Sequence, residues 1–188
     1  MSGDLTGRFR TPWGEGSVTV RRGRLIGVDL PPSGATRAGA PGPEVPVPGS
    51  EVSAPSAETD PGERAALDRW VEELEAYFRG ERLAWGGEDV SLDELAAGSF
   101  DRAVYATLLS VPPAVTVSYG TLAEMAGYPR AARAVGNAMA SNPVPVVIPC
   151  HRVIRSDGSL GNYGDDPAWK ERLLEHERQH AGGGADGR

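Results

Sequence analysis

The chain has 188 residues, and its 19 lysine and arginine side chains stand against 26 aspartates and glutamates, a formal net charge of −7 at pH 7. This balance argues against a protein that holds nucleic acid by bulk electrostatics. The single cysteine excludes an intrachain disulfide and favours a reducing, cytoplasmic location. The sequence contains no secretory signal pattern and no apolar run near the roughly 18 residues of a membrane span, so we expect no membrane partner.

The charge is distributed unevenly along the chain. Residues 101–155 carry five arginines against two carboxylates, whereas residues 1–100 and 156–188 are both acidic. A locally basic segment inside an acidic chain permits contact with phosphates without strong non-specific affinity. A chance fluctuation of three charges accounts for the same count, so charge alone leaves nucleic-acid binding open.

The N-terminal part is predicted to be a small α/β domain over residues 1–90. Residues 5–30 have the alternation and turn signals of β strands. Residues 31–62 hold eight of the 16 prolines, and we expect a flexible insert there. A helix is predicted from about Glu63 to Gly80, because apolar residues recur at helical spacing. These residues are Leu67, Trp70, Val71, Leu74, Tyr77 and Phe78.

The C-terminal part, residues 91–180, is predicted to be mainly helical, with a flexible tail over 181–188. Ser99 is expected to cap a helix that ends before Pro112, and Ser118 to cap a short helix that ends at Gly127. A further helix is expected over residues 129–140, with Pro129 in its first turn. A last helix is expected to open at Asp166-Pro167.

The helices predicted over residues 118–127 and 129–140 form a helix-turn-helix. In the second helix only Arg130, Arg133 and Asn137 could reach bases, and most other positions are alanine or glycine. Small side chains allow a close approach that suits a minor groove about 6 Å wide. The pattern predicts DNA contact with little sequence preference. The alternative is a small-residue face that packs against a neighbouring helix.

The run Pro149-Cys150-His151-Arg152 places the only cysteine beside a potential base, with apolar residues on both sides. A thiol in such a place can act as a nucleophile if a neighbouring group removes its proton. Most unpaired cysteines are instead small core residues. The run therefore predicts a nucleophilic cysteine, with a packing role as the alternative.

Several blocks occur in a fixed order through the C-terminal part: Ser118-Tyr119, residues 131–136, Asn142-Pro143, residues 148–153 and Gly161-Asn162-Tyr163. Their order and spacing resemble the methylated-DNA–protein-cysteine methyltransferase family, which repairs guanine alkylated on its exocyclic oxygen. The resemblance extends from about Phe100 to Glu177. It implies a ribonuclease-H-like N-terminal α/β domain and a mainly α, winged-helix-like C-terminal domain.

The resemblance implies that Cys150 accepts a methyl or alkyl group from guanine, and from thymine as well, once per protein molecule. It implies a relay in which His151, oriented by Glu177, takes the thiol proton through a water molecule. Tyr119 would donate a proton to the leaving base, and Asn142 would hold the active-site segment by hydrogen bonds. The resemblance implies no cofactor, no metal and no obligatory protein partner.

The implied partner is double-stranded DNA, bound through its minor groove with the damaged base flipped out. Arg133 would fill the gap that the flipped base leaves in the stack. The residues expected to bind DNA are Arg130, Arg133, Tyr119, Ala132, Asn137 and Arg152. The residues expected to form the pocket wall are Met139, Val153, Gly161, Asn162 and Tyr163.

Three other functions fit parts of the sequence. The segment from His176 to His180 matches the H-E-x-x-H zinc-protease pattern, with His151 as the only further histidine. A lesion-binding module without chemistry would not need Cys150. A cysteine hydrolase would use the same thiol but turn over many times on activated esters.

Overall fold

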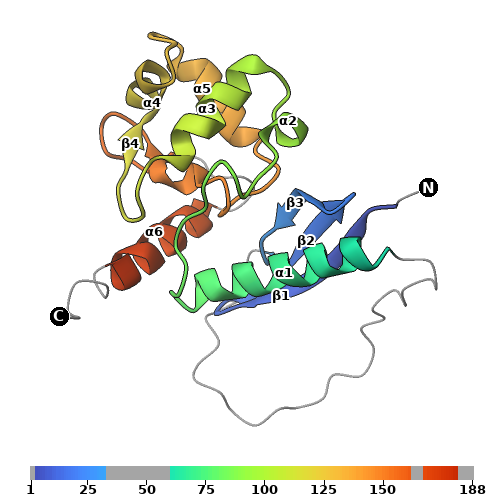
Figure 1. Cartoon of the computed structure of the whole chain (residues 1–188). Coiled ribbons are helices and arrows are strands. Elements are labelled where there is room, and N and C mark those ends of the chain that lie inside the picture. Colours follow the sequence, from blue (N-terminus) through green and yellow to red (C-terminus); the bar gives the residue numbers. More distant parts are fainter. Residues whose placement is uncertain (1–2, 33–59, 162–166, 182–188) are drawn as a thin grey trace, which may run out of the picture.

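Residues 5–29 form a three-stranded antiparallel sheet with the order β1-β2-β3 (Figure 1). Its strands are β1 (Leu5–Thr11), β2 (Gly14–Arg21) and β3 (Arg24–Asp29). Arg22 and Gly23, with φ angles of 50° and 74°, form the tight turn between β2 and β3. The β structure expected over residues 5–30 is therefore confirmed. This computed structural model describes residues 3–32, 60–161 and 167–181.

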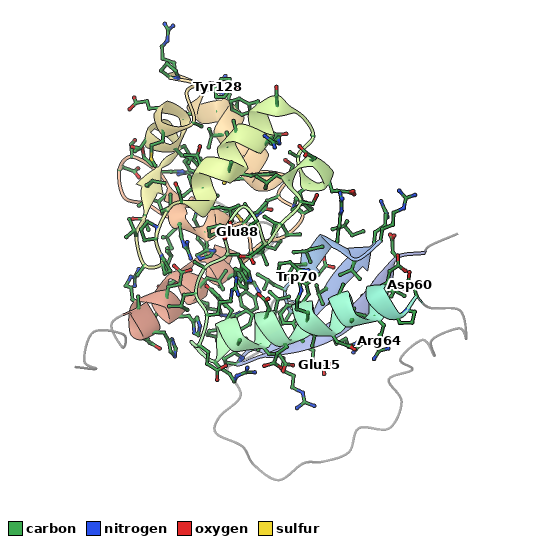
Figure 2. The ribbon with its side chains drawn as sticks, in the orientation of Figure 1. Glu15, Asp60, Arg64, Trp70, Glu88 and Tyr128 are labelled. Atoms are coloured by element: carbon green, nitrogen blue, oxygen red, sulfur yellow. The ribbon has the colours of Figure 1, made fainter. Side chains whose placement is uncertain are left out.

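Helix α1 (Pro61–Phe78) covers one face of this sheet. It begins two residues before the predicted start, because Asp60 accepts a hydrogen bond from the Gly62 backbone at 2.8 Å and Pro61 occupies the first turn. Five of the six apolar residues predicted to form its inner stripe are buried, and Val71 is partly buried against the same core; Trp70 is 1 % exposed (Figure 2). Residues 33–59 of the predicted insert lie outside the described residues.

The second layer is helical and contains α2 (Leu92–Leu95), α3 (Ser99–Leu109), α4 (Tyr119–Met125) and α5 (Ala132–Ala140). Ser118 caps α4 as predicted, since its Oγ accepts from the Thr121 backbone at 3.0 Å. Ser99 does not cap α3; Gly98 occupies that position and Ser99 is the first helical residue. Tyr128, one of three large apolar side chains that are exposed among the described residues, lies at the outer end of this layer, away from α1 (Figure 2).

The helix predicted to begin at Pro129 begins instead at Ala132. The reason is Arg130, whose φ angle of 72° places it in the left-handed region that a helix cannot contain. The turn between α4 and α5 is therefore longer than the sequence indicated, and Arg130 lies in the turn. Helices α4 and α5 still pack on each other as the predicted helix-turn-helix.

After α5 the chain forms a short 3₁₀ turn, η1 (Cys150–Arg152), and then β5 (Val153–Ile154), which pairs in parallel with β4 (Val117–Ser118). The last helix, α6 (Pro167–Ala181), lies between the helical layer and the layer formed by α1 and the sheet (Figure 1). Residues 141–161, the described part of the chain between α5 and α6, contain no α-helix, which agrees with their proline content.

The two layers share one apolar core, in which Trp169 of α6 meets Trp13 of the turn between β1 and β2 at a ring-centroid distance of 5.5 Å. Two hydrogen bonds join the layers near the end of β3, from Val28 N to Pro143 O at 2.9 Å and from Trp169 Nε1 to Pro31 O at 3.0 Å. The fold is thus of mixed α/β content. Among the described residues, no helix has the length and apolar character needed to span a bilayer.

Candidate functional site

An open groove of about 1760 Å³ lies where α4, α5, α6 and the end of β3 meet. Cys150 lines this groove although its side chain is only 6 % exposed. The thiol is therefore accessible from one direction and covered on the others. The sequence-predicted residues that also line the groove are Tyr119, Ala132, Arg133, Asn137, Met139, Asn142 and Gly161.

Asn142 fixes the segment that presents Cys150. Its Oδ1 accepts from Val144 N at 3.1 Å, and its Nδ2 donates to Ile148 O at 2.9 Å and to the Cys150 Sγ at 3.1 Å. A donor aimed at sulfur stabilises the thiolate relative to the thiol. The geometry agrees with the expected role of Asn142 and adds a direct contact with the sulfur.

His151 is fully buried, and its Nε2 lies 2.8 Å from Glu177 Oε1. Burial lowers the pKa of His151, which keeps the imidazole neutral at neutral pH. With the Nε2 proton directed at the carboxylate, the lone pair lies on Nδ1. Nδ1 is buried and has no hydrogen-bond partner among residues 3–32, 60–161 and 167–181. This nitrogen can therefore act as a base.

Glu177 is the anionic centre of the site. Burial alone would raise its pKa, but the hydrogen bonds and charges of His151 and Arg152 outweigh burial and hold the pKa at about 2. Its oxygens also accept from the Tyr77 hydroxyl at 3.1 Å and from the Ala114 backbone at 2.8 Å. The carboxylate is therefore ionised at neutral pH and held by donors from three segments: α1, the loop at Ala114 and η1.

The prediction that Arg152 contacts DNA is wrong. Its side chain is 1 % exposed, and its Nη2 donates to Glu177 Oε1 and to Leu83 O, both at 2.7 Å. Its Nη1 donates to Val111 O at 2.6 Å. The five donors of a guanidinium suit a buried carboxylate flanked by carbonyls, and this use cannot be told from a phosphate contact by sequence alone.

Tyr119, the first residue of α4, is half-buried on the wall of the groove. Burial raises the pKa of its hydroxyl, with a further contribution from Cys150, so the group stays protonated at neutral pH. A Cβ built on Gly161 would lie 3.5 Å from this hydroxyl, which places the Gly161 backbone beside it. Tyr119 can therefore donate a proton or a hydrogen bond into the groove.

Sequence reasoning missed Lys170, the only lysine of the chain. It lines the groove, is 1 % exposed, and lies with Nζ 5.7 Å from the Tyr119 ring centroid. Burial lowers the pKa of Lys170 to about 8, against an opposing effect of Cys150. The sequence does contain a pattern that predicts this position, because Lys170, Leu173 and Glu177 are at i, i+3 and i+7 and so share the buried face of α6.

The remaining predicted residues divide into three groups. Arg133 and Asn137 are exposed on α5 along the groove, and Arg130 is exposed in the preceding turn. Val153, predicted to form part of the pocket wall, is fully buried in β5 and does not line the groove. Asn162 and Tyr163 lie outside the described residues.

The zinc-protease pattern gains no support from the geometry. His176 Nε2 lies 2.7 Å from the Tyr77 carbonyl, and His180 Nδ1 lies 2.8 Å from the His176 carbonyl. His151, the third candidate ligand, is held by Glu177. No group of three or more histidine, cysteine or acidic side chains among the described residues is arranged to bind a metal ion.

Comparison with known proteins matches residues 99–179 to the family model described as 6-O-methylguanine DNA methyltransferase, DNA binding domain. A methylated-DNA–protein-cysteine methyltransferase of Mus musculus is 53 % identical over 108 residues, which cover 55 % of this chain and 51 % of the mouse protein. The chain thus matches about half the length of that relative. The protein of the same name from Mycobacterium bovis is 43 % identical over 122 residues, 65 % of this chain and 70 % of the relative.

The whole fold also has a counterpart among solved structures. The crystal structure of Mycobacterium tuberculosis OGT in complex with DNA superposes with a TM-score of 0.68 at 29 % identity and covers 93 % of each chain. The likeness therefore includes the N-terminal layer, which the sequence blocks did not cover. Together with the matching relatives, it shows that this chain belongs to the methylated-DNA–protein-cysteine methyltransferase family.

Proposed function

We propose that the protein repairs alkylated DNA by direct reversal, moving a methyl or alkyl group from the exocyclic oxygen of guanine, or of thymine, to Cys150. The observation that carries the proposal is the buried array in which His151 is backed by Glu177 and stands beside a thiol that lines an open groove. A soft sulfur nucleophile suits displacement at an sp³ carbon. The family membership supports the same chemistry.

In the proposed reaction the thiol proton passes to His151 Nδ1 through a water molecule, and Glu177 stabilises the resulting imidazolium. The sulfur attacks the alkyl carbon, so a carbon–sulfur bond forms while the carbon–oxygen bond breaks. The electron pair of that bond goes to guanine, which takes a proton from the Tyr119 hydroxyl. The products are unmodified guanine and a thioether at Cys150, and the proton held by His151 returns through solvent to the Tyr119 oxygen, so both side chains end neutral. Since a thiolate is a poor leaving group from an alkyl carbon, the thioether is not cleaved and each molecule acts once.

The surface proposed to contact DNA is the exposed side of α5, where Arg133, Asn137 and the small residue Ala132 lie along the groove. We place this helix in the minor groove of the duplex, with the damaged base flipped toward Cys150 and Arg133 in the vacated stack. A winged-helix-like C-terminal domain over residues 91–180 and a ribonuclease-H-like domain over 1–90 complete the proposed architecture. A cytoplasmic location stays a prediction, based on the lone cysteine.

The direct test is to count the methyl groups that each protein molecule removes from DNA. We expect a duplex oligonucleotide with one O6-methylguanine to lose at most one methyl group per protein molecule, as measured by chromatography of the bases after digestion. The amount of unmodified guanine should stop increasing once every protein molecule has reacted. Continued turnover would favour a hydrolase. Tight binding to the methylated duplex without any loss of methyl groups would favour the lesion-binding module.

Replacing Arg133 with alanine should slow methyl transfer from duplex DNA by roughly 10–100-fold, because the unstacking cost is then not offset by a side chain in the stack. Transfer from free O6-methylguanine base should not change, since the free base needs no flipping. Single-turnover rates on both substrates give the comparison. Arg130→Ala, exposed in the turn, is the matched control and should lose far less. Equal losses on duplex and free base would contradict the role of Arg133.

A further inference from the structure

The anionic centre of the site is contacted from the N-terminal layer, which supplies none of the reacting groups. Tyr77, the penultimate residue of α1, is fully buried and donates its hydroxyl to Glu177 Oε1 at 3.1 Å. Its ring stacks on Trp85 at a centroid distance of 5.8 Å with an interplanar angle of 23°. Its carbonyl lies 2.7 Å from His176 Nε2. Tyr77 is therefore fixed both by its side chain and by its backbone carbonyl.

We infer that Tyr77 is a positioning residue whose hydrogen bond to Glu177 restrains the basicity of His151. The inference rests on the proposed function for its biological meaning. The predicted effect is on the reactivity of the Cys150 thiol, through His151 and Glu177, so the inference can be tested without DNA.

The His151 and Tyr77 donors share one oxygen atom of Glu177. Glu177 Oε1 accepts from His151 Nε2 at 2.8 Å and from the Tyr77 hydroxyl at 3.1 Å. A hydroxyl that donates to a carboxylate stabilises part of its negative charge. The same charge is what stabilises a proton on the imidazole. Each donor on Oε1 therefore weakens the pull of Glu177 on a proton at His151.

The other groups that face this pair all remain when the hydroxyl is removed. Arg152 and the Ala114 backbone donate to Glu177, and Lys170 and His176 of α6 lie close enough to act electrostatically on His151. Burial, followed by the charge of Glu177, raises the pKa of Tyr77 well above its usual value. Tyr77 is thus a neutral donor throughout the neutral pH range.

Tyr77→Phe removes only this hydroxyl and keeps the ring against Trp85. Because the chain has one cysteine, the rate of its carbamidomethylation by iodoacetamide can be followed by intact mass from about pH 5 to about pH 9. We expect the rate on the neutral plateau to rise about threefold and the acid-side midpoint to move up by about half a pH unit. Rates well below the midpoint should equal those of the wild type.

This pattern follows from the coupled titration of Cys150 and His151. A more basic imidazole converts more of the neutral pair into thiolate and imidazolium, which raises the plateau. When His151 is already protonated, the affinity of the sulfur for its own proton is unchanged. A hydroxyl with only a packing role would leave the midpoint in place.

The matched control is Tyr105→Phe. Tyr105 is 1 % exposed and donates to Ala138 O at 2.9 Å, so this variant also loses one buried hydroxyl. We expect it to keep the wild-type pH profile. The inference is overturned if the Tyr77→Phe profile superimposes on the wild type, or if its rates fall at every pH with the midpoint unchanged. A wild type that alkylates normally with iodoacetamide but never accepts a methyl group would contradict the proposed function alone.

Discussion

Replacing Glu177 with glutamine should lower the free energy of unfolding by about 3–5 kcal/mol and slow methyl transfer by at least about a hundredfold. The first effect arises because the Arg152 guanidinium, 1 % exposed, would keep its charge without a counter-ion. The second arises because an amide stabilises an imidazolium at His151 far less than a carboxylate does. Chemical denaturation and single-turnover kinetics measure the two effects.

The matched control is Glu175→Gln on the same helix. Glu175 pairs with Arg178 at the surface, where both side chains are more than half exposed, and such pairs contribute about 0–1 kcal/mol. We expect this variant to unfold and react almost as the wild type does. A Glu177→Gln protein with the stability and rate of the Glu175→Gln protein would contradict the proposed role of the buried carboxylate.

The same carboxylate makes stability depend on pH. In the folded protein the pKa of Glu177 is held at about 2, below the value of 4.5 for an unperturbed glutamate. Its contribution, of the order of 3 kcal/mol, is therefore fully present above about pH 4.5 and is lost as the pH falls toward 2. The Glu177→Gln variant should lack this part of the acid transition.

Replacing Cys150 with serine should reduce methyl transfer by at least roughly 10⁴-fold while leaving affinity for methylated duplex DNA within about threefold. A hydroxyl in the same place is a far weaker nucleophile toward an alkyl carbon, and His151 cannot ionise it to a useful degree. The exposed face of α5 is unchanged by the substitution. Transfer of a labelled methyl group and a binding titration on the same duplex give the two quantities.

Replacing Cys150 with alanine, beside the serine variant, separates the loss of the nucleophile from the loss of a local hydrogen bond. Cys150 is buried at 6 % exposure and accepts a hydrogen bond from Asn142 Nδ2, which also donates to Ile148 O. The serine variant keeps an acceptor for both N–H groups of that amide, whereas the alanine variant keeps only Ile148 O. Both variants should bind methylated DNA and neither should demethylate it. Loss of methyl groups from DNA with either variant would mean that another residue accepts them.

Much of the fold and part of the candidate site can be predicted from patterns within short stretches of the sequence. The cap at Ser118, the stripe of α1 and the β strands are local features, and the structure confirms them. The pair Cys150 and His151 is a local feature as well, because the two residues are adjacent in sequence. Helix boundaries were less accurate, because a single left-handed residue, Arg130, moves the start of α5 by three positions.

The errors concern residues whose partners are distant in sequence. The sequence predicts a DNA contact for Arg152, whereas its guanidinium donates to Val111, Leu83 and Glu177, which lie between 25 and 69 residues away in the chain. Tyr77 meets Glu177 across 100 residues. No periodicity or motif reports such pairs. The fold brings them together, so the electrostatic support of the relay appears only in three dimensions.

The central claim is that the Cys150 sulfur is the alkyl acceptor, and mass spectrometry tests it most directly. The protein is incubated with a duplex that contains O6-methylguanine, weighed intact and then digested for peptide mapping. We predict a gain of about 14 Da, confined to the peptide that contains Cys150. An unchanged mass after the methylated base has disappeared, or a methyl group on any other residue, would contradict the account.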